Sequence, residues 1–256
     1  MSLNLITTLP KLDNHNENFT YWWNKQGEWV ETPNERRGGF SGVIKTLNKQ
    51  GEILYIKKQE GHIYRSLLYP FGQATIRREY NAYLAFNKAK VRTPQVIYCG
   101  QLGKKAILVT KALANFISFE EWLNNARQAN TQAATISAVL DSIANMLVQL
   151  HKNHLQHNCI YSKHIFVNVL ERQKVTVHAA LLDLEKSRKR FTAKQAALHD
   201  TLQIRRHSAI SHTEWLYFAK QYEMYFGSPL PKLYQLPPTP LYLDTQTLYQ
   251  HTKIID

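Results

Sequence analysis

One stretch of the chain, residues 157–185, holds side chains that exchange protons and bind metal ions: the imidazoles of His157 and His164, the thiol of Cys159 and the carboxylate of Asp183. Asp183 follows an apolar run, so it is expected where a strand ends, at the rim of a sheet. An ordinary aspartate in a turn is the competing interpretation. A carboxylate at such a rim suits the transfer of a phosphoryl group, which relies on metal binding and charge stabilisation.

The spacing within this stretch follows the kinase pattern H-R-D-L-x-x-x-N and then D-F-G. His157 holds the first position, and Asp183 holds the metal-binding position of the second motif. Asn158 and Cys159 replace the Arg-Asp pair, and His164 replaces the Asn that would bind a second metal ion. The stretch therefore predicts a modified catalytic loop and a metal-binding strand end.

The segment before residue 80 supplies the groups that bind phosphates in such a site. Gly39 and Gly42, with Ser41 between them, match the end of a glycine-rich phosphate loop, with Arg37 at the first glycine position. Glycines in a hairpin turn often serve only the turn. Three further candidates are a strand lysine at Lys57, with Lys58 beside it as an alternative, and a helix glutamate at Glu79 that could pair with the lysine.

Apolar periodicity predicts a small lobe of five strands and one helix. Residues 36–45 indicate a hairpin, and residues 52–57 a third strand. Residues 74–88 have helical spacing, and strands at 96–98 and 106–110 complete the sheet.

Helices dominate the chain after residue 113. They are predicted from Ser118, which starts a capping box, through residues 136–151, and then at 199–206 and 214–226. We therefore predict an α+β, bilobed protein-kinase-like fold with four parts: an N-terminal extension at 1–35, an N-lobe at 36–112, a C-lobe at 113–226 and a proline-rich tail at 227–256.

Composition limits the class of partner. The chain has 256 residues, a net charge of +13 and a pI near 9.6, which favours an anionic partner. Its two cysteines, Cys99 and Cys159, form no disulfide or zinc-ligand pattern, so a zinc site is not expected. No window is expected to be apolar enough to span a membrane, and no secretion is expected, because residues 1–18 mix charges and asparagines without an apolar run.

Five segments taken together resemble the lipopolysaccharide kinase family of the Kdo/WaaP type, and most closely its InaA-like branch. They are residues 36–42, 55–59, 77–80, 157–166 and 182–185. The resemblance covers about residues 36–225. It implies an ATP-dependent kinase that transfers the γ-phosphoryl group to a sugar hydroxyl of the lipopolysaccharide core, in the cytoplasm at the inner face of the inner membrane.

The resemblance also implies roles for individual residues. Lys57 would bind the α- and β-phosphates of ATP with Glu79 as its partner, and Asp183 and His164 would bind Mg²⁺ or Mn²⁺. His164 suits Mn²⁺ better, because Mg²⁺ prefers oxygen ligands. Cys159 occupies the position of the catalytic Asp, and a thiol with a reference pKa of about 8.5 mimics a carboxylate base poorly.

Two other functions remain open at this point. A pseudokinase would bind nucleotide and act through a partner or an anionic membrane surface, and a basic nucleic-acid-binding protein would use residues 186–190 with Arg205 and Arg206. No nucleic-acid motif surrounds those residues. His151, His154 and His178 are interpreted as residues of helix ends and the surface. The resemblance implies that His199-Asp200 matches the family's helix aspartate, which braces the catalytic loop.

Overall fold

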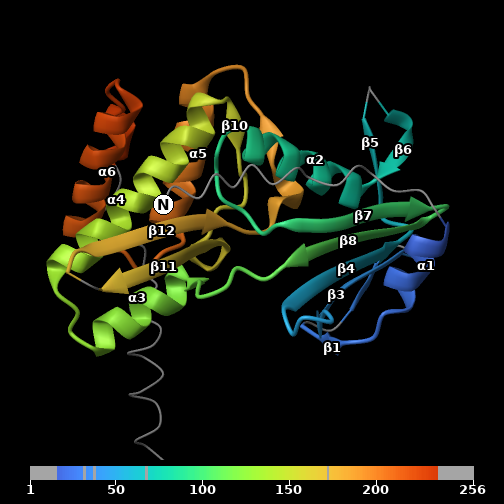
Figure 1. Cartoon of the computed structure of the whole chain (residues 1–256). Coiled ribbons are helices and arrows are strands. Elements are labelled where there is room, and N and C mark those ends of the chain that lie inside the picture. Colours follow the sequence, from blue (N-terminus) through green and yellow to red (C-terminus); the bar gives the residue numbers. More distant parts are fainter. Residues whose placement is uncertain (1–15, 31–32, 37–38, 67–68, 172, 236–256) are drawn as a thin grey trace, which may run out of the picture. The chain divides into compact units, whose positions relative to one another are not determined.

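The computed structural model describes residues 16–30, 33–36, 39–66, 69–171 and 173–235. The described residues divide into two compact units: those within 16–88 and 93–114 form the first, and those within 89–92 and 115–235 form the second. Figure 1 shows the helices and strands of each unit. A mixed sheet-and-helix first unit and a mainly helical second unit agree with the predicted α+β class.

An antiparallel sheet of six strands, in the order β1-β3-β4-β8-β7 with β2 also paired to β3, forms the centre of the first unit. The strands are β1 Glu28–Trp29, β2 Asn34–Arg36, β3 Gly39–Leu47, β4 Ile53–Glu60, β7 Val96–Leu102 and β8 Lys105–Lys111. The sequence predicted five strands. The sixth is β1, which has two residues and is too short to show an alternating pattern.

Helix α1 (Asn16–Asn24) packs against this sheet, although its residues are predicted from sequence to belong to an extension. Phe19 is buried with Ile44 and Ile56, and Trp22 and Trp23 pack against the same cluster. The apolar character of the aromatic residues near position 22 predicts that they pack against the neighbouring part of the chain, and the structure confirms this.

The predicted helix at 74–88 is confirmed as α2 (Thr75–Lys88), which follows the hairpin of β5 (Ile63–Ser66) and β6 (Tyr69–Ala74). Gln59 on β4 ties the start of this helix to the sheet. Its side-chain oxygen accepts hydrogen bonds from the Thr75 hydroxyl at 2.5 Å and from the Ile76 backbone N–H at 3.2 Å. These two hydrogen bonds join strand β4, which carries Lys57, to helix α2, which carries Glu79.

The second unit contains α3 (Phe119–Gln128), α4 (Ala133–Lys152), α5 (Ala193–Arg206) and α6 (His212–Phe226). Ser118 caps α3 as predicted, accepting from the Glu121 N–H at 3.1 Å. Helix α5 begins six residues before the predicted 199, at the Thr192 cap, because its first turns carry small alanines that show little periodicity. Ser211 likewise starts α6 earlier than predicted, through a capping box with Glu214.

Helix α4 contradicts the expectation that no window is apolar enough to span a membrane. Over 18 residues its mean hydropathy is 1.4, which meets the requirements of length and composition. However, 56% of that window is buried inside the unit, including Val139, Leu147 and Leu150. This burial is typical of a core helix.

Two small sheets complete the second unit. One has the order β12-β11-β9, from β12 (Val175–Leu181), β11 (Ile165–Glu171) and β9 (Ile117–Ser118). The other pairs β10 (Leu155–Gln156) with β13 (Arg188–Lys189). Because β10 and β13 lie side by side, the chain between them closes into a loop that carries the predicted catalytic stretch. The turns are η1 (Ser162–His164), η2 (Leu184–Lys186) and η3 (Pro231–Leu233).

Candidate functional site

Lys57 and Glu79 form an ion pair, with the Lys57 Nζ 2.7 Å from the Glu79 Oε2. Glu79 is only 5% exposed, so its side of the ion pair lies largely out of water. Alternation along β4 turns the neighbouring Lys58 to the other face, where its Nζ donates to the Lys25 carbonyl at 2.9 Å. The structure thus distinguishes the two lysines, and the paired one is Lys57.

The predicted phosphate-loop residues Gly39, Ser41 and Gly42 lie within strand β3. A Cβ atom at Gly42 would lie 2.6 Å from the Trp29 ring, and one at Gly39 would lie 2.8 Å from the His62 ring. Both positions therefore require glycine for packing, whatever else they do. Arg37 lies outside the described residues.

Asp200 on α5 holds the loop that begins at His157. Its Oδ2 accepts the His157 backbone N–H at 2.7 Å, and its Oδ1 accepts the Asn158 N–H at 3.0 Å. Asn158 has φ 67°, a left-handed conformation that asparagine tolerates better than most residues. The bracing role considered for Asp200 thus agrees with its hydrogen bonds.

The His157 ring connects this loop to the strand end that carries Asp183. Its Nε2 lies 2.8 Å from the Leu182 carbonyl, and a carbonyl only accepts, so this nitrogen carries the proton. Burial lowers the pKa of His157, which keeps the ring neutral and the tautomer defined. His157 is therefore placed as an orienting residue between the two motifs.

Cys159, His164 and Asp183 lie together in the second unit. One ligand atom from each residue lies within 4.8 Å of those from the other two. Strand register explains the juxtaposition: Ile165 pairs with Leu181, and the Leu182 N–H donates to the His164 carbonyl at 2.9 Å. The residue after Leu182 must then lie beside His164.

Asp183 itself has φ 59° and ψ 67°, so a non-glycine residue occupies the left-handed region. This conformation costs about 1 kcal/mol or more and is common at functional sites. The Asp183 side chain is 42% exposed, whereas that of His164 is 14% exposed. The carboxylate is accessible to a ligand at the end of β12.

The resemblance of the sequence to a kinase family predicts Mg²⁺ or Mn²⁺, and the donors of this cluster can be compared with those ions. Mg²⁺ requires oxygen donors in near-octahedral geometry. Of the three clustered side chains, only Asp183 supplies oxygen, whereas Cys159 supplies sulfur and His164 nitrogen. The set does not fit Mg²⁺.

His151 corrects one prediction, because it is fully buried rather than a surface residue. Its Nε2 lies 3.2 Å from the Asp200 carboxylate, and its Nδ1 lies 2.6 Å from the Tyr222 hydroxyl. Burial alone would raise the pKa of Asp200, but hydrogen bonds from His151 and His199 outweigh it and hold that pKa well below its usual range. The sequence signal for this network was the helical spacing of His151 with the apolar face of α4.

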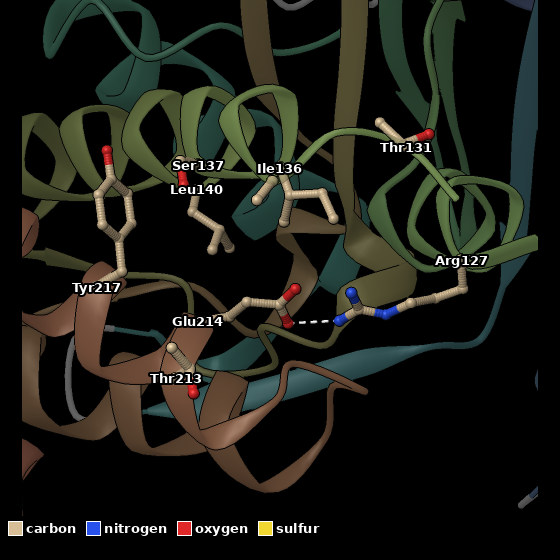
Figure 2. A pocket seen from close by; sticks show the side chains of 9 residues that line it. Arg127, Thr131, Ile136, Ser137, Leu140, Thr213, Glu214 and Tyr217 are labelled. Carbon is tan, nitrogen blue, oxygen red and sulfur yellow. Dashed lines mark hydrogen bonds and ion pairs between the residues drawn. The ribbon is translucent and has the colours of Figure 1, made fainter. Parts of the chain in front are cut away.

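A pocket with a volume of about 370 Å³ lies elsewhere in the second unit, lined by residues of α3, α4 and α6 (Figure 2). Arg127 forms an ion pair with Glu214 at this pocket, and Ile136 and Leu140 supply apolar walls. None of the predicted site residues lines it. We assign it no chemistry, because its guanidinium and carboxylate are already paired.

Within the first unit, a strand lysine is paired with a helix glutamate. In the second, a braced histidine loop leads to a strand-terminal aspartate. With the α+β architecture, these features define a kinase-like fold. A solved structure of WaaP in complex with acyl carrier protein matches with a TM-score of 0.64 and 17% identity, over 92% of this chain and 90% of that one. At this identity the match supports the fold alone.

Sequence comparison identifies the family. The lipopolysaccharide kinase (Kdo/WaaP) family matches residues 20–222. Protein InaA of Escherichia coli (strain K12) is 34% identical over 205 residues, which are 78% of this chain and 92% of that protein. The chain belongs to the lipopolysaccharide kinase (Kdo/WaaP) family, as the resemblance of its motifs predicted.

Proposed function

We propose that this protein is an ATP-dependent phosphotransferase that moves the γ-phosphoryl group of ATP to a sugar hydroxyl of the lipopolysaccharide-core type. The observation that carries the proposal is the Lys57–Glu79 ion pair at 2.7 Å. A buried glutamate that holds a lysine from the adjacent strand is the arrangement by which kinases present an ammonium group to phosphates. Family membership supports the same reaction class.

The proposal assigns nucleotide binding in the first unit to five residues. Lys57 binds the α- and β-phosphates, and Glu79 orients its ammonium group. The remaining three contribute backbone near the phosphates: Gly39, Ser41 and Gly42.

The remaining roles fall to the second unit. His157 orients the loop through its bond to the Leu182 carbonyl, and Cys159 stands at the position of the catalytic base. Asp183 and His164 are assigned to a divalent cation such as Mn²⁺, which accepts an imidazole nitrogen better than Mg²⁺ does. The acceptor, a phosphorylated or otherwise anionic core sugar, is suited to a chain of net charge +13.

One observation favours a second candidate, a pseudokinase that binds nucleotide without turnover. Cys159 is 5% exposed and offers a thiol where a carboxylate is expected. General-base catalysis contributes about 10²- to 10⁴-fold to a reaction rate, so its loss would leave slow transfer or none. Nucleotide binding through Lys57 would be unaffected.

We also propose that the protein works in the cytoplasm and contacts the inner face of the inner membrane. The basis is the family's lipopolysaccharide substrate class and the exposed basic residues around Phe191, including Lys189 and Lys194. Anionic headgroups attract such residues by about 1 kcal/mol for each charge near the surface.

Calorimetric titration of ATP into the full chain, with Mg²⁺ and then Mn²⁺, tests the nucleotide site. We expect Lys57→Ala to weaken ATP binding by about 10- to 100-fold, the value of a hydrogen bond to a charged group. Lys58→Ala is the matched control, because that side chain faces away from Glu79. Thermal melts of both variants separate loss of binding from loss of fold.

The same samples distinguish the two candidates. Metal-dependent ATP consumption that Asp183→Ala abolishes supports the phosphotransferase. Binding without consumption, in the presence of core sugars, supports the pseudokinase. Wild-type protein that binds no ATP with either cation contradicts both.

A further inference from the structure

His164 has a defined tautomer. Its Nδ1 lies 2.7 Å from the Cys159 carbonyl oxygen, which only accepts hydrogen bonds. The Nδ1 therefore donates, and a neutral His164 presents a lone pair at Nε2. A metal-binding histidine is commonly oriented in this way, by a carbonyl bonded to its other nitrogen.

That lone pair faces a carboxylate. The His164 Nε2 lies 3.6 Å from the Asp183 Oδ2, beyond the usual range of a hydrogen bond. Two electron-rich atoms at this separation repel each other unless a proton or a metal cation lies between them. With zinc–nitrogen and zinc–oxygen bond lengths of about 2.0–2.2 Å, neighbouring nitrogen and oxygen donors in a tetrahedral site lie about 3.3–3.5 Å apart. The observed 3.6 Å exceeds the upper end of that range by only about 0.1 Å.

The third donor is the Cys159 sulfur, which completes the cluster within 4.8 Å. Lys186 lies beside it, with its Nζ 4.0 Å from the Sγ. The thiolate is the form of cysteine that binds metals. On metal binding the thiol proton leaves to solvent, and no oxidant or reductant is required.

We propose that Cys159, His164 and Asp183 bind one borderline transition-metal ion of the zinc class, with the exposed Asp183 side leaving a position open for a ligand oxygen. The donors are sulfur, nitrogen and oxygen, which select Zn²⁺ or Co²⁺ over Mg²⁺. The inference rests on the proposed function only in linking this cation to nucleotide. It differs from the expectation, drawn from cysteine spacing, that a zinc site is absent.

Sequence spacing concealed this site for a physical reason. Cys159 and His164 come from one loop, but Asp183 arrives through the β11–β12 hairpin, so the three do not form a short motif. The turn η1 returns the chain toward Cys159, since the His164 N–H donates to the Tyr161 carbonyl at 2.9 Å. Only strand register brings the carboxylate to the other two donors.

Titration of Co²⁺ into the metal-free full chain tests the proposal. We expect one equivalent to produce a thiolate-to-cobalt charge-transfer band, with visible bands of a four- or five-coordinate ion. Zn²⁺ should abolish the bands, and excess Mg²⁺ should leave them. Cys159→Ser should remove the charge-transfer band, and His164→Gln should weaken Co²⁺ binding at least about 10-fold.

Cys99→Ser is the matched control, because Cys99 is the other buried free cysteine and belongs to the first unit. That variant should keep the band. A wild-type protein without a stoichiometric band overturns the proposal, as does a Cys159→Ser variant that retains it. If Cys159→Ser fails to fold, His164→Gln decides, and unchanged Co²⁺ affinity in that variant overturns the proposal.

The Lys57→Ala variant separates this inference from the proposed function. We expect it to keep the cobalt band and to lose ATP affinity. Nucleotide binding that depends on Lys57, in a protein without the band, leaves the phosphotransferase standing and removes the metal site. A protein that shows the cobalt band but binds no nucleotide keeps the metal site and contradicts the phosphotransferase.

Discussion

Cys159 stands where the kinase pattern has a carboxylate, and its neighbours show which groups a carboxylate would meet. The Lys186 Nζ lies 4.0 Å from its sulfur. Charge on Cys159 raises the pKa of the Tyr161 hydroxyl, so that hydroxyl remains protonated and able to donate. The ammonium group of Lys186 and the hydroxyl of Tyr161 would therefore stabilise an anionic side chain at position 159.

Cys159→Asp should raise the rate of ATP consumption by about 10²-fold or more, because a carboxylate serves as a general base near neutral pH and a thiol does so poorly. The rate is measured as nucleotide diphosphate release with core-sugar acceptors and Mn²⁺. Cys159→Asn is the control, because asparagine has nearly the same size as aspartate but carries no charge. Equal rates in these two variants would contradict the role of a base at this position.

Helix α5 supports the loop that begins at His157, because its Asp200 side chain accepts hydrogen bonds from the two consecutive backbone N–H groups of His157 and Asn158. The Thr192 side chain caps that helix by accepting from the Gln195 N–H at 3.2 Å. Helices α4 and α6 contribute His151 and Tyr222 to the same network. Side chains from three helices thus fix the position of the backbone at His157, where the loop begins.

Asp200→Ala should destabilise the protein by about 3–5 kcal/mol, because it leaves buried donors without their acceptor. Chemical denaturation at pH 7 measures this change. Thr201→Ser, at the next buried position of α5, keeps its hydroxyl and should cost less than about 1.5 kcal/mol. Equal losses in the two variants would show that the Asp200 carboxylate has no special role.

The same carboxylate gives a pH dependence. The pKa of Asp200 is lower in the folded protein than its ordinary value of 3.8, so the unfolded chain binds the proton more readily. Its contribution to stability is therefore complete above about pH 4 and is lost as the pH falls through the folded pKa. Between pH 4 and pH 2 the free energy of unfolding should fall less steeply in Asp200→Asn than in wild type.

At the scale of the whole molecule, the charge of +13 is accompanied by one unusually exposed aromatic side chain. Phe191 is 94% exposed, the highest value among large apolar residues in the described part of the chain. The His154 ring holds its backbone by donating to the Phe191 carbonyl at 3.0 Å. A fixed backbone that presents a ring among basic residues is suited to an anionic membrane surface.

Phe191→Ser should weaken binding to vesicles that contain anionic lipid by about 5- to 10-fold, because the apolar ring no longer leaves water. Co-sedimentation at several salt concentrations measures this, and binding should fall as salt rises. Met224→Ser is the control, since Met224 is 61% exposed on α6 and the residues directly before and after it, Glu223 and Tyr225, are not basic. Equal loss in both variants would remove Phe191 as a membrane contact.

The sequence alone predicted the class of fold, the order of the motifs and the candidate residues Glu79, His157, His164, Asp183 and either Lys57 or Lys58, because periodicity and motif spacing are local properties of a chain. Tertiary structure decided the features that depend on distant pairings. Strand alternation distinguished Lys57 from Lys58, and the β11–β12 register placed Asp183 beside His164. His151 was expected at the surface, but the structure buries it within a hydrogen-bonded core network. Each of these outcomes arises from packing between segments far apart in sequence, which no local pattern records.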